Sequence, residues 1–387
     1  MIDPRFDRRF MAAALAVGRQ GHGLTAPNPS VGAVLVREGP TGPIIVGAGR
    51  SANGGRPHAE TAALAMAGPQ AARGATCYVT LEPCSHHGKT PPCAEALIAA
   101  GIGGVVVAIT DPNPEVAGRG IAGLQAAGIP VRLGVRAAEA ARDLAGHITR
   151  MTHGRPHVTL KLAVSADGGI GRTGVAPGKG QIAISGPLSR TRVHLMRAEH
   201  DAIAVGIGTV LADDPELTSR LPGLAGHSPA RIVFDTWART PPDAALLHRG
   251  TSPVTIMVGE GADPARTAAL SDAGAEIVTL PAAPGGVDLR AALSLLGRRG
   301  ITTLLVEGGA RLAEALVAGG LADEVVIVAG PARLGADAIL PFGGDVAGGL
   351  APSHIVRHRL LIGDDRWTYW ERQCSPESSP TSDASNP

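Results

Sequence analysis

The stretch that decides the fold of the first half reads TLEPCSHHGKTPPC at residues 80–93, and PHAE precedes it at residues 57–60. Together these segments supply one histidine and two cysteines that suit tetrahedral zinc and leave a fourth position for water: His58, Cys84 and Cys93. Zinc lowers the pKa of such a water, so that hydroxide is available near neutral pH. Glu60 lies two residues after the histidine, where it can move a proton without binding the metal. The pattern therefore predicts a catalytic zinc site.

The distance between the two cysteines departs from the usual zinc deaminase signature. That signature is H-x-E followed by P-C-x-x-C, whereas eight residues separate Cys84 from Cys93 here. His86 and His87 are rival ligands, because each lies nearer to Cys84 in the sequence. We expect Cys93 to bind, since it stands where a helix should begin and a helix N-terminus favours the thiolate. Taken singly, each of these residues would be interpreted as an ordinary core residue; their joint occurrence indicates the metal site.

Length and composition indicate two domains. The chain has 387 residues, which is too long for one ordinary core. Its 35 basic and 34 acidic residues leave a net charge of +1, which argues against a nucleic-acid partner. Four cysteines are too few for a disulfide scaffold, and no segment approaches the ~18 uninterrupted apolar residues of a membrane span. We therefore expect a cytoplasmic protein with no membrane partner.

Short β-branched runs alternate with alanine-rich stretches through the first half. Helices are expected to begin near His58 and Cys93, and the first two strands should form a hairpin. The expected strands cover residues 31–36, 44–49, 75–81, 104–110 and 131–135. Such alternation predicts a sheet covered by helices on both faces.

A second alternating series follows a break in the pattern at residues 150–157. Its expected strands are 157–164, 202–206, 231–235, 254–259, 276–280, 302–307 and 324–330, and its expected helices are 187–198, 288–298 and 310–318. Residues 355–362 and 367–370 are expected to form a closing antiparallel pair. We therefore expect domains over residues 1–152 and 153–373, and a disordered tail over 374–387.

Two glycines lie between a strand and a helix in VEGGARLAEAL, residues 306–316. Backbone amides at such a helix start can bind a phosphate. The pair could equally be a tight turn, and no complete G-x-G-x-x-G follows the first strand of this half, which disfavours a standard Rossmann site.

The chain resembles a known family at this point. PNPSVGAVLV, HAE, TLEPCSHHGKTPPC and DPNPEVAGRG are similar to the first half of the bifunctional riboflavin-biosynthesis deaminase/reductases. LKLAVSADG, LMRAEHDAIAVGIGTVLADDPELTSR, RIVFD and VEGGARLAEAL follow the second half in order. The resemblance implies an α/β protein with a cytidine-deaminase-like three-layer αβα domain and a dihydrofolate-reductase-like α/β domain. It also implies a homo-oligomer, a dimer or a tetramer.

The resemblance further implies the reaction. The first domain would deaminate the phosphorylated pyrimidine 2,5-diamino-6-(5-phosphoribosylamino)pyrimidin-4-one with one Zn²⁺ per chain. The second would use NADPH to reduce the ribosyl chain, giving 5-amino-6-(5-phosphoribitylamino)uracil. Asn28 would contact the pyrimidine, His86 and Lys89 would approach the ribose phosphate, and Asp111 and Asn113 would close the pocket. A phosphorylated substrate needs cationic donors in this loop, although Lys89 could also be an ordinary exposed lysine.

In the second half the resemblance assigns two sets of residues. Cofactor binding falls to Ala163, Ala183, Thr209, Asp213, Gly309, Ala310, Arg311, Leu312, Ala313, Glu314 and Ala315. Substrate binding falls to Gln181, Arg197, Leu217, Arg220 and Glu307. Guanidinium groups suit the ribose 5-phosphate, but either arginine could instead make a surface salt bridge.

The segment QIAIS at residues 181–185 departs from the family pattern. Many relatives carry a tryptophan near the nicotinamide, and Ala183 stands at that position after an insertion over residues 172–180. One alternative is therefore a deaminase whose second half is a non-catalytic binding or oligomerisation module. Another, a nucleic-acid-editing deaminase, is disfavoured by the balanced charge and by the long loop between the cysteines.

Overall fold

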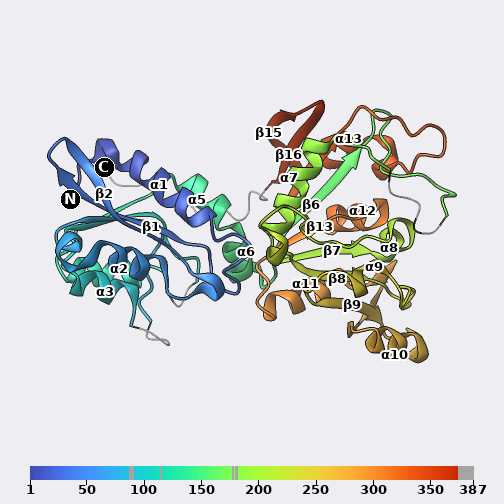
Figure 1. Ribbon diagram of the computed structural model, residues 1–387, viewed down its shortest axis with the longest axis horizontal. Helices are drawn as coiled ribbons and strands as arrows, with labels where there is room; N and C mark the ends of the chain where they lie inside the picture. Colours follow the sequence, from blue (N-terminus) through green and yellow to red (C-terminus); the bar gives the residue numbers. More distant parts are fainter. Residues whose placement is uncertain (87–90, 114–115, 177, 179–181, 374–387) are drawn as a thin grey trace, which may run out of the picture.

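The computed structural model describes residues 1–86, 91–113, 116–176, 178 and 182–373. Two α/β domains, each built on one large β-sheet, lie side by side, one in each half of the chain (Figure 1). His87, Lys89, Gln181 and the expected tail lie outside the described residues. Among the helices described, none is long and apolar enough to cross a membrane.

The first sheet has five strands in the order β2-β1-β3-β4-β5. Their bounds are β1 Gly32–Gly39, β2 Gly42–Arg50, β3 Thr76–Leu81, β4 Gly104–Ile109 and β5 Val131–Leu133. The expected hairpin is confirmed, since β1 and β2 pair antiparallel with Gly39 opposite Gly42. Strands β3, β4 and β5 run parallel to one another.

Helices cover both faces of this sheet, which confirms the three-layer αβα expectation. Helices α1 (Asp7–Arg19) and α5 (Ala137–Asp143) pack on one face through Phe10, Leu15 and Ala140. Helices α2 (Ala59–Ala72), α3 (Cys93–Ala99) and α4 (Arg119–Ala126) pack on the other. The core beneath α2, α3 and α4 is mainly aliphatic, and the expected metal ligands His58 and Cys93 stand at the starts of α2 and α3.

The second sheet has nine strands in the order β10-β9-β8-β7-β13-β6-β14-β16-β15. The strands from β10 to β14 in this order run parallel, and β16 runs antiparallel to both β14 and β15, so the expected closing antiparallel pair is present. Their bounds are β6 His157–Val164, β7 Ala202–Gly206, β8 Ala230–Phe234, β9 Val254–Gly259, β10 Glu276–Leu280, β13 Thr303–Val306, β14 Glu324–Ala329, β15 His354–Ile362 and β16 Asp365–Arg372. A small hairpin, β11 (Ala282–Ala283) with β12 (Gly286–Val287), was not expected.

Helices also cover both faces of the second sheet. One face carries α7 (Pro187–Ala198), α8 (Ile207–Asp213), α9 (Ala245–His248) and α10 (Pro264–Asp272). The other carries α11 (Leu289–Arg298), α12 (Ala310–Ala318) and α13 (Val346–Leu350). Short 3-10 turns lie at Pro4–Phe6, Asn53–Gly55, Ala225–His227 and Pro341–Gly344. The bounds of α7 and α12 are those expected, whereas α8, α9, α10 and α13 were not expected.

The connection between the two sheets follows helix α6 (Ala145–His153) and lies within residues 150–157, where the sequence pattern breaks. Helix α6 continues to His153 and ends at Gly154, whose φ of 67° suits a glycine C-cap. The connection to β6 at His157 is therefore only Gly154, Arg155 and Pro156. So short a connection brings the two sheets close together at α6 (Figure 1).

Candidate active sites

Three side chains that can bind a metal, from three segments, meet beyond the end of β3, the middle strand of the first sheet. His58 is the residue before α2, Cys84 follows β3, and Cys93 begins α3. His58 Nδ1 lies 3.5 Å from Cys84 Sγ and 3.3 Å from Cys93 Sγ. A tetrahedral zinc ion with ordinary bond lengths needs N···S edges of about 3.6 Å. The donor set therefore fits zinc in both chemistry and spacing.

The pKa values of the two thiols of this site are shifted in opposite directions. The hydrogen bond from the Cys93 thiol lowers the pKa of Cys84 to about 4, and His58 adds to the effect. The same bond and burial raise the pKa of Cys93. The Cys93 backbone N–H also donates to Cys84 Sγ at 3.3 Å. Cys84 is thus prepared as a thiolate, which is the form that binds a metal.

Glu60 lies in the first turn of α2 and is only 3% exposed. Burial raises the pKa of its carboxyl to about 7. A carboxyl group with a pKa near neutrality can both accept and return a proton. Its position next to the three ligands matches the proton-transfer role expected from the sequence, which stays a proposal.

Sequence reasoning missed Glu82, which organises the neighbouring pocket loop. Its buried carboxylate accepts backbone N–H groups at distances of 2.9 to 3.3 Å from Asp111, Gly118, Gly120 and Ile121. The glutamate of the EPC motif therefore holds the chain after β4 and the start of α4. The feature that could have pointed to Glu82 is its position directly after β3, a strand whose six residues are all buried.

Asp111 and Asn113 share this loop, as expected. Asp111 Oδ1 accepts the Asn113 N–H at 2.9 Å and lies 3.2 Å from His147 Nε2 on α6. Burial alone would raise the pKa of Asp111, but the hydrogen bonds from His147 and Asn113, with the charge of His86, lower it. His147 is a lone helical histidine with no sequence signal.

The remaining expected pocket residues lie nearby on other segments. His86 is exposed, and its charge acts on Asp111. Asn28 lies on the loop before β1, and its side chain donates to Gly54 O at 3.2 Å. Gly54 belongs to the turn shortly before His58, so this bond brings Asn28 toward the metal ligands.

In the second half, Arg197 and Glu307 come together. The guanidinium and carboxylate form two bonds, and Arg197 Nη1 also donates to Thr218 O at 3.1 Å. Lys161 on β6 is half-buried near both. Burial lowers the pKa of Lys161, while Glu307 opposes that shift. Sequence reasoning missed Lys161. The feature that could have pointed to it is a charged residue in the middle of the otherwise mainly apolar strand β6.

The other expected substrate residues lie on the loop after α8. Leu217 is buried, with a φ of 58°. The Arg220 side chain is 51% exposed and pairs with Glu216 at 3.2 Å. The structure therefore shows for Arg220 the surface salt bridge that was the alternative interpretation.

The start of α12 forms a cradle suited to phosphate. Gly309 precedes the helix, and no side chain caps its amides. A Cβ on Gly309 would lie 3.8 Å from Thr209 Oγ1, so these two expected cofactor residues face each other. Uncapped amides at a helix N-terminus bind anions. The cradle therefore fits a dinucleotide phosphate.

The other expected cofactor residues lie on α12, at the end of α8 and on β6. Ala310, Arg311 and Ala315 lie on α12, where Leu312 packs against Gly206 and Gly308 and Ala313 is buried. Glu314 instead accepts the Phe342 N–H at 2.8 Å. Asp213 ends α8, and burial raises its pKa. Ala163 is half-buried on β6.

Ala183 is exposed and borders a hollow between the start of α7 and the β15–β16 turn. Asp365 lies on the opposite side of this hollow and accepts the Gly186 N–H at 2.7 Å. The segment that carries Ala183 is therefore fixed at its α7 end.

Comparisons with known proteins agree with both halves of this picture. Residues 4–109 match the cytidine and deoxycytidylate deaminase zinc-binding region, and residues 156–353 match the RibD C-terminal domain. The chain is thus a zinc-binding-type deaminase domain followed by a reductase domain. It belongs to the RibD family of riboflavin biosynthesis proteins.

Individual relatives support this assignment. The riboflavin biosynthesis protein RibD of Escherichia coli strain K12 is 43% identical over 346 residues, which are 86% of this chain and 89% of that protein. RibD of Bacillus amyloliquefaciens is 40% identical, over 84% of this chain and 85% of its own length. RibD of Acinetobacter baumannii superposes with a TM-score of 0.81 at 36% identity and covers 96% of this chain and 100% of its own.

A Thermotoga maritima structure adds the chemical description. It is a diaminohydroxyphosphoribosylaminopyrimidine deaminase/5-amino-6-(5-phosphoribosylamino)uracil reductase, with a TM-score of 0.79, 31% identity and coverage of 95% of this chain and 99% of its own. Because both domains are present, these findings support a bifunctional enzyme over a deaminase with a non-catalytic second half.

Proposed function

We propose that this chain catalyses two consecutive steps of riboflavin biosynthesis on a phosphorylated pyrimidine. In the first step, water adds to C2 of 2,5-diamino-6-(5-phosphoribosylamino)pyrimidin-4-one. The bond between C2 and its amino group then breaks, and this group leaves as ammonia. In the second, a hydride and a proton add at the ring-opened ribose, giving 5-amino-6-(5-phosphoribitylamino)uracil. The meeting of His58, Cys84 and Cys93 beside buried Glu60 carries the proposal.

In the deaminase step, His58, Cys84 and Cys93 would hold one zinc ion per chain. Bound zinc supplies a water whose pKa is about 7. Glu60, buried in the first turn of α2, accepts a proton from the attacking water and delivers it to the departing amine.

The pocket loops would bind the substrate. We assign Asn28 to the pyrimidine, Asp111 and Asn113 to the closure of the pocket, and His86 and Lys89 to the ribose phosphate. The charge of His86 close to Asp111 supports the placement of this group.

In the reductase step, the amides at the start of α12 and Thr209 would hold NADPH, which supplies the hydride. Ala163, Ala183 and Asp213 would line the rest of the cofactor site. Substrate would lie against Glu307, Leu217, Arg220 and Gln181, with Arg197 holding Glu307 in place. Lys161, half-buried beside Glu307, is the side chain positioned to hold the proton of this step.

Mass spectrometry of the products tests the proposal. Without NADPH, the diaminopyrimidine substrate should stop at the deaminated ribosylamino product; with NADPH, it should proceed to the ribityl product. Failure to form the first product would reject the deaminase assignment. By family resemblance we also infer a cytoplasmic homo-oligomer of two or four subunits, which light scattering of the purified protein would check.

A further inference from the structure

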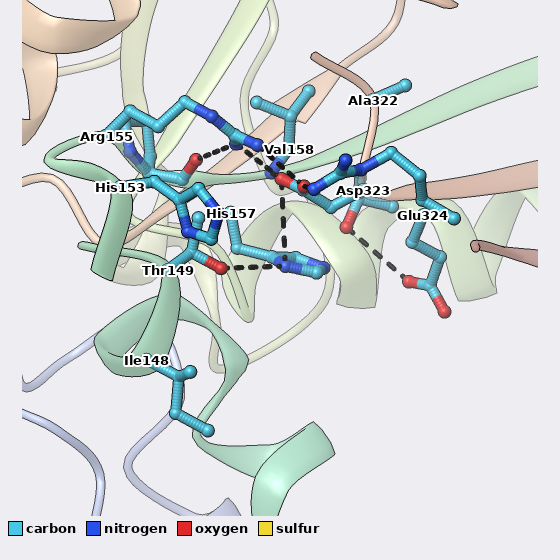
Figure 2. Close-up of polar contacts among 12 residues, drawn as sticks. Ile148, Thr149, His153, Arg155, His157, Val158, Ala322, Asp323 and Glu324 are labelled. Atoms are coloured by element: carbon cyan, nitrogen blue, oxygen red, sulfur yellow. Dashed lines mark hydrogen bonds and ion pairs between the residues drawn. The ribbon is translucent and has the colours of Figure 1, made fainter. Parts of the chain in front are cut away.

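Helix α6 (Ala145–His153) connects the two domains and contacts both: Ile148 packs on the core of the first sheet, and the helix also packs on the second sheet. A Cβ on Gly146 would lie 2.7 Å from Thr303 Cγ2, so the helix packs directly on the start of β13. Thr149 Oγ1 lies 3.4 Å from His157 Nδ1 at the start of β6 (Figure 2). The helix is therefore held against the reductase sheet at both of these points.

A buried ion-pair cluster strengthens this attachment. Asp323 accepts two bonds from Arg155, at 2.6 and 2.8 Å, and the Val158 N–H at 3.0 Å (Figure 2). Arg372 of β16 adds a bond at 3.3 Å. Because Asp323 and Arg155 are each 8% exposed, breaking this cluster would leave charges buried without partners. The chain that follows α6 is thus firmly fixed to the second sheet.

From this attached helix, Arg150 reaches back to the deaminase domain. Its Nε donates to Gly297 O of α11 at 2.9 Å, and its Nη1 donates to Pro27 O at 3.3 Å. One guanidinium therefore binds a carbonyl of each domain. Pro27 immediately precedes Asn28, the residue assigned to the pyrimidine.

The reductase domain also contacts directly the loop before β1, which contains Gly23 and Pro27. A Cβ on Gly300 would lie 2.8 Å from Pro27 Cβ, and a Cβ on Gly23 would lie 2.2 Å from Ala198 O. The loop thus contacts the ends of α11 and α7, so its position depends on the reductase domain.

We propose that Arg150 is a positioning residue for deamination: it fixes residues 25–28, and with them Asn28, to the reductase domain. The inference rests on the proposed deaminase function. It means that the deaminase pocket is completed by a domain that carries out a different reaction. Arg150 acts through Pro27 and touches neither the metal ligands nor Glu60.

Kinetics of Arg150→Ala in the full-length, zinc-loaded enzyme test this role. Loss of one charge-assisted bond should raise the deaminase KM about five- to tenfold and leave kcat within about twofold. The reductase KM and kcat, measured with the deaminated intermediate, should not change. Arg298→Ala is the matched control, because Arg298 lies in the last turn of α11 and, among the residues that the structure describes, donates within its own helix to Ser294 Oγ. Arg150→Lys, which retains the charge, should have a deaminase KM between those of Arg150→Ala and wild type.

Hydrogen exchange separates this inference from the proposed function, because it requires no substrate. The backbone amides of Thr25, Ala26 and Asn28 should exchange faster in Arg150→Ala than in wild type and at the wild-type rate in Arg298→Ala. Unchanged exchange, an unchanged deaminase KM, or equal losses in both activities would overturn the positioning role. Absent deamination in the wild type would instead reject the proposed function, and exchange would still decide the role of Arg150.

Discussion

Arg197 and Glu307 form a two-bond ion pair, with Nε 2.7 Å from Oε1 and Nη2 3.0 Å from Oε2. The pair neutralises the arginine and fixes the carboxylate in one orientation. Arg197 is therefore not a free cation for a substrate phosphate, and we infer that it acts by holding Glu307 in position.

The pH dependence of stability tests this pair. Burial alone would raise the pKa of Glu307, but Arg197 and Lys161 lower it to about 2. Because this folded-state pKa lies below the ordinary value of 4.5, the pair stabilises the fold above pH 4.5 and loses that contribution as the pH falls toward 2. Glu307→Gln should lower the free energy of unfolding by about 3 kcal/mol at neutral pH. The stability of this variant should also fall less steeply than that of wild type as the pH is lowered.

Tryptophan fluorescence provides the measurement, since all three tryptophans, Trp237, Trp367 and Trp370, lie in the second half. Urea unfolding at several pH values would yield the free energies. Glu276→Gln, which breaks the exposed pair with Arg299, is the control and should follow the wild-type slope. The same slope in Glu307→Gln as in wild type would contradict the role of the pair.

Replacing Glu60 should separate metal binding from catalysis. Glu60→Gln is expected to retain stoichiometric zinc and to lower the rate of ammonia release at least about 100-fold, because the amide cannot carry the proton. Metal analysis and an ammonia assay would be run on the same sample. Glu38→Gln, at an exposed position of β1, should leave both unchanged. Retained turnover in Glu60→Gln would show that another group moves the proton.

The metal ligands can be tested by zinc content alone. Cys93→Ser should lose zinc, because an alcohol at this position does not provide the thiolate ligand. Cys77→Ala removes a buried cysteine of the same domain that lies outside the ligand group and should retain the metal. Stoichiometric zinc in Cys93→Ser would point to His86 or His87 as the third ligand.

Glu82 is expected to be essential to the stability of the pocket loop. Glu82→Ala leaves four backbone N–H groups without their acceptor, so the deaminase domain should lose about 3 kcal/mol. Differential scanning calorimetry would show the lowered transition. Glu38→Ala, at an exposed position of β1, is the control. An unshifted transition in Glu82→Ala would mean that water replaces the carboxylate.

Local sequence patterns were sufficient for the main elements and for the grouping of His58, Cys84 and Cys93, which could hold a metal ion. The bounds of α7 and α12 follow from apolar periodicity, and His58 and Cys93 stand at helix starts because their motifs combine a ligand with an element boundary. These features depend on neighbours within a few residues. Helices α8 and α10 were missed because their short sequences carry weak periodicity, and tertiary packing decides their state.

The residues that sequence reasoning missed act through distant partners. Glu82 binds Gly120 across 38 positions, and His147 meets Asp111 across 36. Nothing local to either residue specifies such a partner. The pairing of Arg197 with Glu307, 110 positions apart, likewise changes the interpretation of an arginine whose motif was recognised correctly.

The central claim is that one chain carries out both reactions, and the stoichiometry of ammonia and NADPH tests it most directly. Full-length, zinc-loaded protein would be given the diaminopyrimidine substrate and NADPH, with ammonia release and NADPH oxidation followed together. The account predicts one ammonia released and one NADPH oxidised per substrate, with ammonia appearing first. Ammonia release without NADPH oxidation would contradict it and leave the second half as a non-catalytic module.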